Sequence, residues 1–295
     1  MNVIKEMSIM SKIFPEKITM ASIYDLKRRE LTNEEKEKFY SKYYYKEMAE
    51  IPSSDLEIVN MGPVDSSKGI TIYERNEMMD PGYLDMETGY TVMPDGSGLA
   101  ATLVKMPGVT PEMLDWWFNW HPLEGLRYAI WCPVAHTDIS VKDKEKHLDS
   151  SGASLRERNY GGVHYPVEGF TLKNSQKLRI EFFSPEEFGL DFNKFKEPNI
   201  SRAYVANVVV DGNNLSINVF FHAVRKVEEG VEYRSRYWLG YRMINGVPKR
   251  KNRLMPKRVM MHMARNNCIH SLMEYNNLAS FLPQLYKEMN GKIEN

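Results

Sequence analysis

The segment from residue 201 to 243 alternates apolar and polar residues with a period of two, and this pattern constrains the fold more than any other feature of the chain. Turns at Asp211-Gly212 and at Gly230 interrupt it, so it predicts three antiparallel strands joined as hairpins. Pro256 then opens a long amphipathic stretch that predicts a helix running close to the chain end. Together they predict an α+β fold in which a curved antiparallel sheet wraps one long C-terminal helix and leaves a cavity between them.

The same alternation assigns side chains to the two faces of the predicted sheet. Phe220 and His222 share one face of the second strand, and Tyr237 lies among alternating aromatic residues of the third. If these polar and aromatic faces are the concave ones, His222 and Tyr237 point into the cavity.

Turn residues and a helix start organise the segment before this meander. Between Gly82 and Met106, a turn at Asp95-Gly96 predicts short antiparallel strands. Pro111 follows Thr110 in the pattern of a helix start, and the segment after it is rich in tryptophan. We expect these large rings to be core residues, because most folds bury tryptophan for its area.

The chain is predicted to begin with a helical arm. Thr32 and Glu35 have capping-box spacing, and helical periodicity continues to Pro52. Either the chain's own domain or a partner subunit must cover the aromatic stripe on this helix. The stripe consists of Phe39, Tyr40, Tyr43 and Tyr44. We assign residues 1–60 to a dimerisation arm and residues 61–295 to a single larger domain.

Composition excludes several classes of protein. Lys and Arg together number 39, as do Asp and Glu, and the one basic run, Pro248 to Arg253, indicates a solvated turn rather than a nucleic-acid surface. Two cysteines, Cys132 and Cys268, give no disulfide framework. The sequence shows neither a membrane-spanning apolar run nor a signal peptide, so we expect a cytoplasmic protein that does not bind membranes.

His270 and Glu274 are the first candidate metal ligands. Four residues apart on the predicted helix, they share one face and can bind one cation, although the same spacing occurs in ordinary surface and core pairs. Earlier segments offer further ligands, and spacing alone does not choose among them. The candidates are His136, Glu168 and His222, with His121, His164 and His262 equally possible. His147, in a charged segment, is expected at the surface.

Four segments carry a more specific signal: PGYLDMETGYTVMPDGSG from Pro81, MPGVTPEMLDWWFNWHPLEGLRYAIWCPVAH from Met106, RSRYWLGY from Arg234 and IHSLMEYNNLASFLP from Ile269. From near residue 61 to near residue 285, the chain resembles the 2,4-diacetylphloroglucinol and phloretin hydrolase family. The resemblance implies a homodimeric zinc hydrolase with a helix-grip domain. Such an enzyme cleaves the carbon-carbon bond between a phloroglucinol ring and its acyl group, which is a bond in a ketone.

The resemblance also implies roles for individual residues. The zinc ligands correspond to His136, Glu168, His270 and Glu274. The catalytic histidine corresponds to His222, and the substrate-binding tyrosines correspond to Tyr128 and Tyr237. One departure is that HTDIS has no counterpart of an amide side chain that the family places shortly after the first metal histidine. Contacts to one acyl or hydroxyl group are therefore expected to differ.

These residue types suit the hydrolysis of an aromatic ketone. Zinc is a Lewis acid, an imidazole titrates near neutral pH and can move a proton, and tyrosine hydroxyls can hold phenolic oxygens. Two other functions fit the same residues. A metal-free cavity would make the protein a carrier of an aromatic metabolite, and Fe(II) on the same ligands would make it an oxygen-dependent enzyme.

Overall fold

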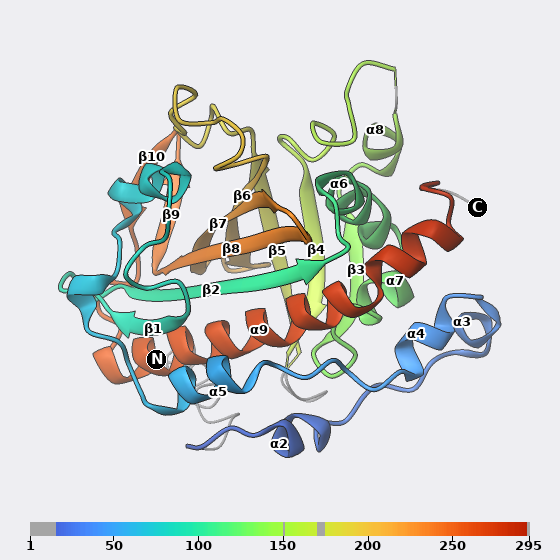
Figure 1. Cartoon of the computed structure of the whole chain (residues 1–295), viewed down its shortest axis with the longest axis horizontal. Coiled ribbons are helices and arrows are strands. Elements are labelled where there is room, and N and C mark those ends of the chain that lie inside the picture. Colours follow the sequence, from blue (N-terminus) through green and yellow to red (C-terminus); the bar gives the residue numbers. More distant parts are fainter. Residues whose placement is uncertain (1–15, 150, 170–174, 294–295) are drawn as a thin grey trace.

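A large antiparallel sheet and a long C-terminal helix, α9, dominate the computed structural model, which describes residues 16–149, 151–169 and 175–293 (Figure 1). The spatial order of the strands in the sheet is β1 (Gly89–Val92), β2 (Gly98–Pro107), β8 (Gly230–Leu239), β7 (Ser216–Val227), β6 (Arg202–Val210), β5 (Gln176–Phe183), β4 (Val163–Glu168) and β3 (His136–Val141). A separate hairpin pairs β9 (Tyr241–Ile244) with β10 (Val247–Arg250). The predicted α+β class is confirmed.

Helices lie before, between and after these strands. The α-helices are α2 (Met20–Tyr24), α3 (Asn33–Glu37), α4 (Ser41–Tyr45), α5 (Ser53–Asn60), α6 (Pro111–Trp120), α7 (Gly125–Ala129), α8 (Lys144–Leu148) and α9 (Lys257–Glu288). Short 3-10 segments are η1 (Ser66–Lys68), η2 (Ile72–Met79) and η3 (His121–Leu123). In the described part of the chain, none of the helices is both long and apolar enough to cross a membrane.

The predicted meander is β6, β7 and β8, but the third strand ends at Leu239, because Gly240 has a positive φ of 81° and the residues after it form β9 of the separate hairpin. The register of the meander places Tyr204 opposite His222, and His222 opposite Ser235. Because side chains alternate along a strand, Phe220 and His222 point toward α9, and Phe221 points into a second hydrophobic core on the opposite face of the sheet. Both faces of the central strands are therefore buried. This division of the faces confirms the prediction that His222 and Tyr237 point to the cavity side.

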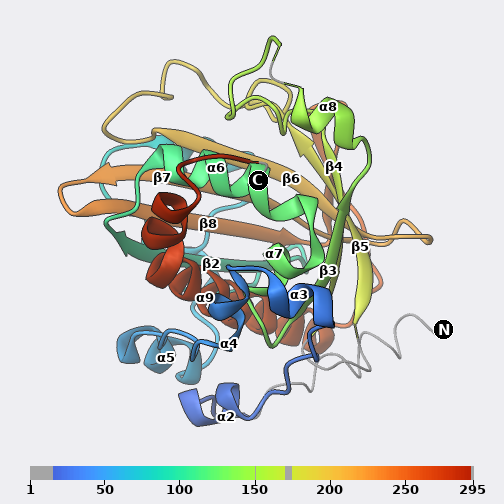
Figure 2. The ribbon, with the colours of Figure 1, turned by 90° about the vertical axis from the view of Figure 1, so that its right-hand side faces the viewer.

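Helix α9 begins directly after Pro256, as predicted, and crosses the sheet. A hydrogen bond of 2.8 Å between the hydroxyls of Thr102 on β2 and Ser271 on α9 ties the two layers together. Figures 1 and 2 both place α9 between the sheet and the N-terminal segments α2 to α5. The helix is therefore covered on both sides, which explains why buried residues occur on most of its circumference.

The tryptophan-rich segment forms α6 and packs into the hydrophobic core that includes the buried residues of α9. Trp116, Trp117 and Trp120 are fully buried there, and the rings of Trp116 and Trp120 stack with centroids 5.0 Å apart. Thr110 caps the helix, its hydroxyl accepting from the Met113 backbone amide. The expectation that these rings belong to the core is confirmed.

The N-terminal arm is not the continuous helix that periodicity predicts. The capping box of Thr32 and Glu35 is present, but α3 ends at Glu37 and α4 covers only Ser41–Tyr45. Tertiary contacts override the periodicity, because the hydroxyls of Tyr40 and Tyr43 donate to Glu124 and Glu288, which lie far along the chain.

The aromatic stripe of this arm is covered by the chain itself. Tyr40, Tyr43 and Tyr44 are almost fully buried within one subunit, and Phe39 alone remains about half exposed, at 46%. Burial of the stripe therefore requires no second subunit. The homodimer and the division of the chain at residue 60 stay predictions.

A buried ionic cluster holds the outer face of β8. Glu87 accepts hydrogen bonds from Arg234 at 2.5 Å and from Arg236 at 3.1 Å, and both guanidinium groups are only 1% exposed. Arg234 and Arg236 also donate to the Met78 and Met86 carbonyl oxygens. Two buried positive charges thus depend on one carboxylate for neutralisation.

We expect Glu87→Ala to lower the free energy of unfolding by about 3–5 kcal/mol, because removal of the carboxylate leaves both buried guanidinium groups without a counter-ion. Asp80→Ala is the matched control, since Asp80 pairs with Lys194 at a partly exposed site and should barely change the midpoint. Urea unfolding of the two variants measures the difference. Equal midpoints would show that the cluster does not stabilise the fold.

Candidate metal centre and cavity

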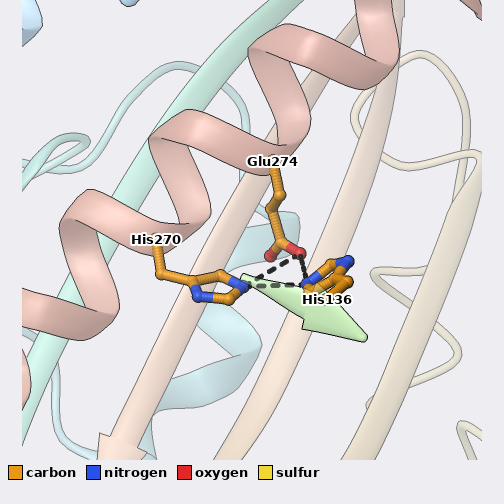
Figure 3. A group of neighbouring side chains, drawn as sticks. All are labelled: His136, His270 and Glu274. Carbon is orange, nitrogen blue, oxygen red and sulfur yellow. Dashed lines mark hydrogen bonds and ion pairs between the residues drawn. The ribbon is translucent and has the colours of Figure 1, made fainter. Parts of the chain in front are cut away.

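The four predicted metal ligands come from three elements. His136 is the first residue of β3 and lies directly opposite Glu168, the last residue of β4, in the antiparallel register. His270 and Glu274 lie one turn apart on α9. Figure 3 shows the His270 and Glu274 side chains extending from α9 toward His136.

The ligand atoms of three of these residues converge. His136 Nε2 lies 3.1 Å from His270 Nε2 and 3.5 Å from a Glu274 carboxylate oxygen, and His270 Nε2 lies 3.4 Å from that oxygen. His136, His270 and Glu274 therefore form a group whose ligand atoms all lie within 4.8 Å of one another. Glu168 is adjacent, with a carboxylate oxygen 3.5 Å from His136 Nε2.

This geometry fits a small cation. Bonds of about 2.0–2.2 Å in tetrahedral geometry would place ligand atoms roughly 3.3–3.6 Å apart, close to the separations seen here. His136 Nδ1 lies 3.3 Å from the Tyr128 carbonyl oxygen, which can only accept a hydrogen bond. Nδ1 therefore donates, and the Nε2 lone pair of His136 faces His270. Two imidazole nitrogens that face each other need a cation or a proton between them.

The electrostatics of the cluster agree with this interpretation. Burial lowers the pKa of His136 well below its ordinary value, and the neighbouring His270 lowers it further. Burial raises the pKa of Glu274 to about 7 and the nearby Glu168 carboxylate adds to this, although His270 opposes the shift. A bound divalent cation would hold both groups deprotonated, as metal ligation requires.

Tyr128 supports two of the predicted ligands at once. Its hydroxyl donates to a Glu168 carboxylate oxygen at 2.6 Å, and its ring stacks on that of His136 with centroids 3.9 Å apart. The hydrogen bond between His136 Nδ1 and the Tyr128 carbonyl fixes the tautomer of His136. Sequence reasoning gave Tyr128 only a substrate-binding role and missed these contacts, because they depend on the packing of α7 against β3.

A cavity of about 220 Å³ lies between α9 and the sheet beside this cluster. A single water molecule needs only about 10–15 Å³, so the cavity can hold an organic molecule. Glu168, His270 and Glu274 line it. The predicted substrate-binding residues Tyr128 and Tyr237 and the predicted catalytic residue His222 line it as well.

His222 belongs to a hydrogen-bonded chain on the cavity wall. The Tyr233 hydroxyl donates to the Tyr275 hydroxyl at 3.2 Å, and the Tyr275 hydroxyl lies 3.3 Å from His222 Nε2. His222 Nδ1 lies 2.8 Å from the Ser235 hydroxyl. Burial lowers the pKa of His222 to about 3, so the imidazole is neutral near pH 7. The sequence signal for Tyr275 was its position directly after Glu274, which sequence reasoning did not use.

Tyr237 is held from the helix side. Its hydroxyl donates to the Ser271 hydroxyl at 3.1 Å, and Ser271 in turn is bonded to Thr102. The hydroxyl of Tyr237 is therefore held on the cavity wall by Ser271, which lies one turn before Glu274 on α9. Ser271 was missed in the sequence because serine in a helix carries no distinctive pattern.

The rival histidines take other positions. His121 and His164 line the cavity without joining the metal cluster of the described residues. His147 is buried, at 6% exposure, and its Nε2 lies 2.9 Å from the Asn119 carbonyl oxygen, so the prediction of a surface residue was wrong. Helix α8 carries His147, and its charged face reaches solvent while His147 turns inward.

Amide side chains reach the cavity from elements other than the segment after His136. Asn218 on β7 donates to Asn267 on α9 at 2.9 Å, and both residues line the cavity. The segment HTDIS contributes no amide side chain to the cavity, but Asn218 on β7 and Asn267 on α9 do.

The buried histidines predict a loss of stability in acid. Burial lowers the pKa of His121 to about 3, whereas an unfolded histidine titrates at about 6.5. Between these values the unfolded chain binds a proton that the folded chain does not, so the free energy of unfolding falls as the pH falls through this window. We expect the His121→Gln variant to bind about one proton fewer than the wild type when it unfolds near pH 5. The slope of the unfolding free energy against pH, obtained from urea unfolding at several pH values, measures this number. An unchanged pH dependence would contradict burial of a neutral His121.

Known proteins match most of the length of this chain. The family model described as "DAPG hydrolase PhiG domain" matches residues 70–287, a range that contains all four predicted ligands. A 2,4-diacetylphloroglucinol hydrolase of Pseudomonas protegens is 29% identical over 260 residues, which cover 84% of each chain. A phloretin hydrolase of Eubacterium ramulus is 31% identical over 266 residues, which cover 86% of this chain and 92% of the relative.

Proposed function

The chain belongs to the DAPG hydrolase family, and on that premise we propose that it is a hydrolase that cleaves the carbon-carbon bond between a phloroglucinol ring and its acyl group. The observation that carries the proposal is the cluster of His136, His270 and Glu274 beside a cavity of organic-molecule size. The reaction consumes water, leaves a hydrogen on the ring carbon and releases the acyl group as a carboxylic acid.

We propose zinc as the metal, held by His136, His270, Glu274 and Glu168. Nitrogen and oxygen donors with near-tetrahedral separations support this choice, and the position of Glu168 supplies a fourth ligand. When bound, zinc supplies a Lewis acid for the acyl oxygen or for the attacking water. Two histidines and one carboxylate also suit Fe(II), so metal analysis must accompany every activity measurement.

The chain's own residues have separate tasks in this proposal. Tyr237 and Tyr128 hold oxygens of the phloroglucinol ring. Each hydroxyl turns its proton from its present acceptor, Ser271 or Glu168, toward the substrate oxygen and stabilises the negative charge that develops there. His222, neutral near pH 7, accepts at Nε2 the proton that the attacking water loses and passes it to the ring carbon, with Tyr275 bonded to the same atom and Ser235 fixing the other nitrogen. The apolar wall of β5 and β6 excludes bulk water from the reacting bond.

Incubation of the purified protein with phloretin and with 2,4-diacetylphloroglucinol, in water enriched in heavy oxygen, tests the reaction. A hydrolase releases a carboxylic acid that carries one heavy oxygen and leaves the ring product without an acyl group. Ligand binding without product would favour a carrier, and loss of activity under anaerobic conditions would favour an iron enzyme.

We also propose that the domain is of the helix-grip type and that the protein forms a homodimer. The cavity enclosed by the sheet and α9 supports the first proposal. The second rests on the resemblance that the sequence shows to its family.

A further inference from the structure

His164 is a buried histidine of the cavity wall that the proposed reaction does not use. It is 2% exposed, it lines the cavity, and its Nε2 atom is buried without a hydrogen-bond partner among the described residues. Burial lowers the pKa of His164 well below the ordinary value, and the nearby His147 and His121 lower it further. The ring is therefore neutral near pH 7 and can give or accept one hydrogen bond at each nitrogen.

An unpaired polar group in this position has a physical cost. Burial strips Nε2 of water, and without a partner in the described part of the chain its lost hydrogen bond is not replaced. His147, its neighbour at 5.5 Å between ring centroids, differs because its Nε2 lies 2.9 Å from the Asn119 carbonyl oxygen. A ligand hydroxyl that reaches Nε2 of His164 would supply the interaction that no described residue makes.

A row of cavity-lining residues on the sheet leads to His164. The register pairs Asn218 with Val208, Val208 with Ile180, and Ile180 with His164, so these residues form one row across β7, β6, β5 and β4. All four side chains line the cavity. The row has two branched aliphatic residues in its centre, which suit the face of an aromatic ring, and a polar residue at each end.

The position of the row relative to the metal cluster decides which part of a substrate it meets. His164 and Glu168 lie on the same face of β4, four residues apart, which corresponds to about 13 Å along the strand. At the opposite end of the row, Asn218 is bonded to Asn267, one helical turn before His270. Two of the three hydroxyls of an acylphloroglucinol adjoin the bond to be broken and the third lies across the same ring, whereas a second ring carried by the acyl chain can extend further from the cluster than any of them.

We propose that His164 is a specificity-determining residue that hydrogen-bonds a hydroxyl on an aryl ring carried by the acyl half of the substrate. The aryl ring lies against Ile180 and Val208. This inference rests on the proposed function for the identity of the substrate, and it makes a ketone with a hydroxyphenyl acyl chain the preferred substrate over an acetyl ketone.

Three substrates and three variants test it. The substrates are phloretin, the analogue of phloretin without the hydroxyl on its phenylpropanoyl ring, and 2,4-diacetylphloroglucinol. We expect His164→Phe to lower kcat/KM for phloretin roughly tenfold, the scale of one buried hydrogen bond, mainly through KM, and to leave the other two substrates nearly unchanged. His164→Gln should restore part of the loss, and His147→Gln, a buried histidine outside the cavity lining, should not alter the ratio of the substrates.

Binding of 4-ethylphenol and of ethylbenzene, measured by calorimetry, separates this inference from the proposed function. If the wild-type protein cleaves none of the ketones yet prefers 4-ethylphenol in a manner that His164→Phe abolishes, the hydrolase proposal fails and the aryl site stands. An equal loss for phloretin and its analogue without the hydroxyl, or equal binding of the two small probes by the wild-type protein, would overturn the role of His164.

Discussion

Replacement of His270 by alanine is expected to remove most of the bound metal and to reduce turnover by more than about 100-fold. His270 Nε2 lies 3.1 Å from His136 Nε2 and 3.4 Å from Glu274, so its loss opens the cluster on the helix side. Changes to residues that merely support metal ligands already cost about 10–100-fold, and removal of a ligand should cost more. The same result is expected for His136→Ala.

His262→Ala is the matched control for these variants. His262 lies on α9 two turns before His270 and outside the cavity lining, so the same substitution on the same helix should retain metal and turnover. Metal content by mass spectrometry and unfolding midpoints should be measured on the same samples. The fold is expected to survive, because the core around α9 is apolar. Full zinc occupancy in both His136→Ala and His270→Ala would show that the ligand set is wrong.

Replacement of His222 is expected to separate chemistry from binding. His222→Ala should retain zinc and bind substrate with similar affinity, yet lose on the order of 100-fold or more in turnover, the usual scale for a positioned acid or base. The measurement is single-turnover cleavage of a phloroglucinol ketone at saturating substrate, with zinc content checked in the same sample.

The contacts of His222 provide the control. Its two nitrogens lie within hydrogen-bond distance of Ser235 and Tyr275, so alanine could also lower the stability of the wall. His222→Gln keeps polar contacts to these neighbours and should show the same loss of turnover with a smaller loss of melting temperature. A structural histidine would behave in the opposite way, with a lower melting temperature and turnover close to that of the wild type.

The candidate site shows how far local sequence signals reach. The spacing of His270 and Glu274 identified one half of the cluster, because helix geometry alone brings residues four apart onto one face. The other half depended on the resemblance to a family, since the spacing left His121 and His164 as possible as His136. Only the pairing of β3 with β4 places His136 opposite Glu168 and directs both toward α9.

Two sequence predictions failed for the same reason. The periodicity of residues 33–50 predicted one helix, and the charged segment around His147 predicted an exposed side chain. In both cases contacts with distant residues decided the outcome, through Glu124 and Glu288 for the tyrosines and through Asn119 for His147. Local propensity is weak compared with such contacts.

The sequence by itself determined the α+β class, the β6 to β8 meander and the helix after Pro256, because strand alternation, tight turns and helix starts depend on residues close together in the chain. It also predicted that His270, Glu274, His222 and Tyr237 could face one cavity, if the polar and aromatic faces of the strands were the concave ones. The tertiary structure alone decided the partners: Tyr128 bonded to Glu168, Tyr275 bonded to His222, and Nε2 of His164 buried without a hydrogen-bond partner among the residues that the structure describes. These relations depend on burial and on strand register across large sequence separations, which no local pattern encodes.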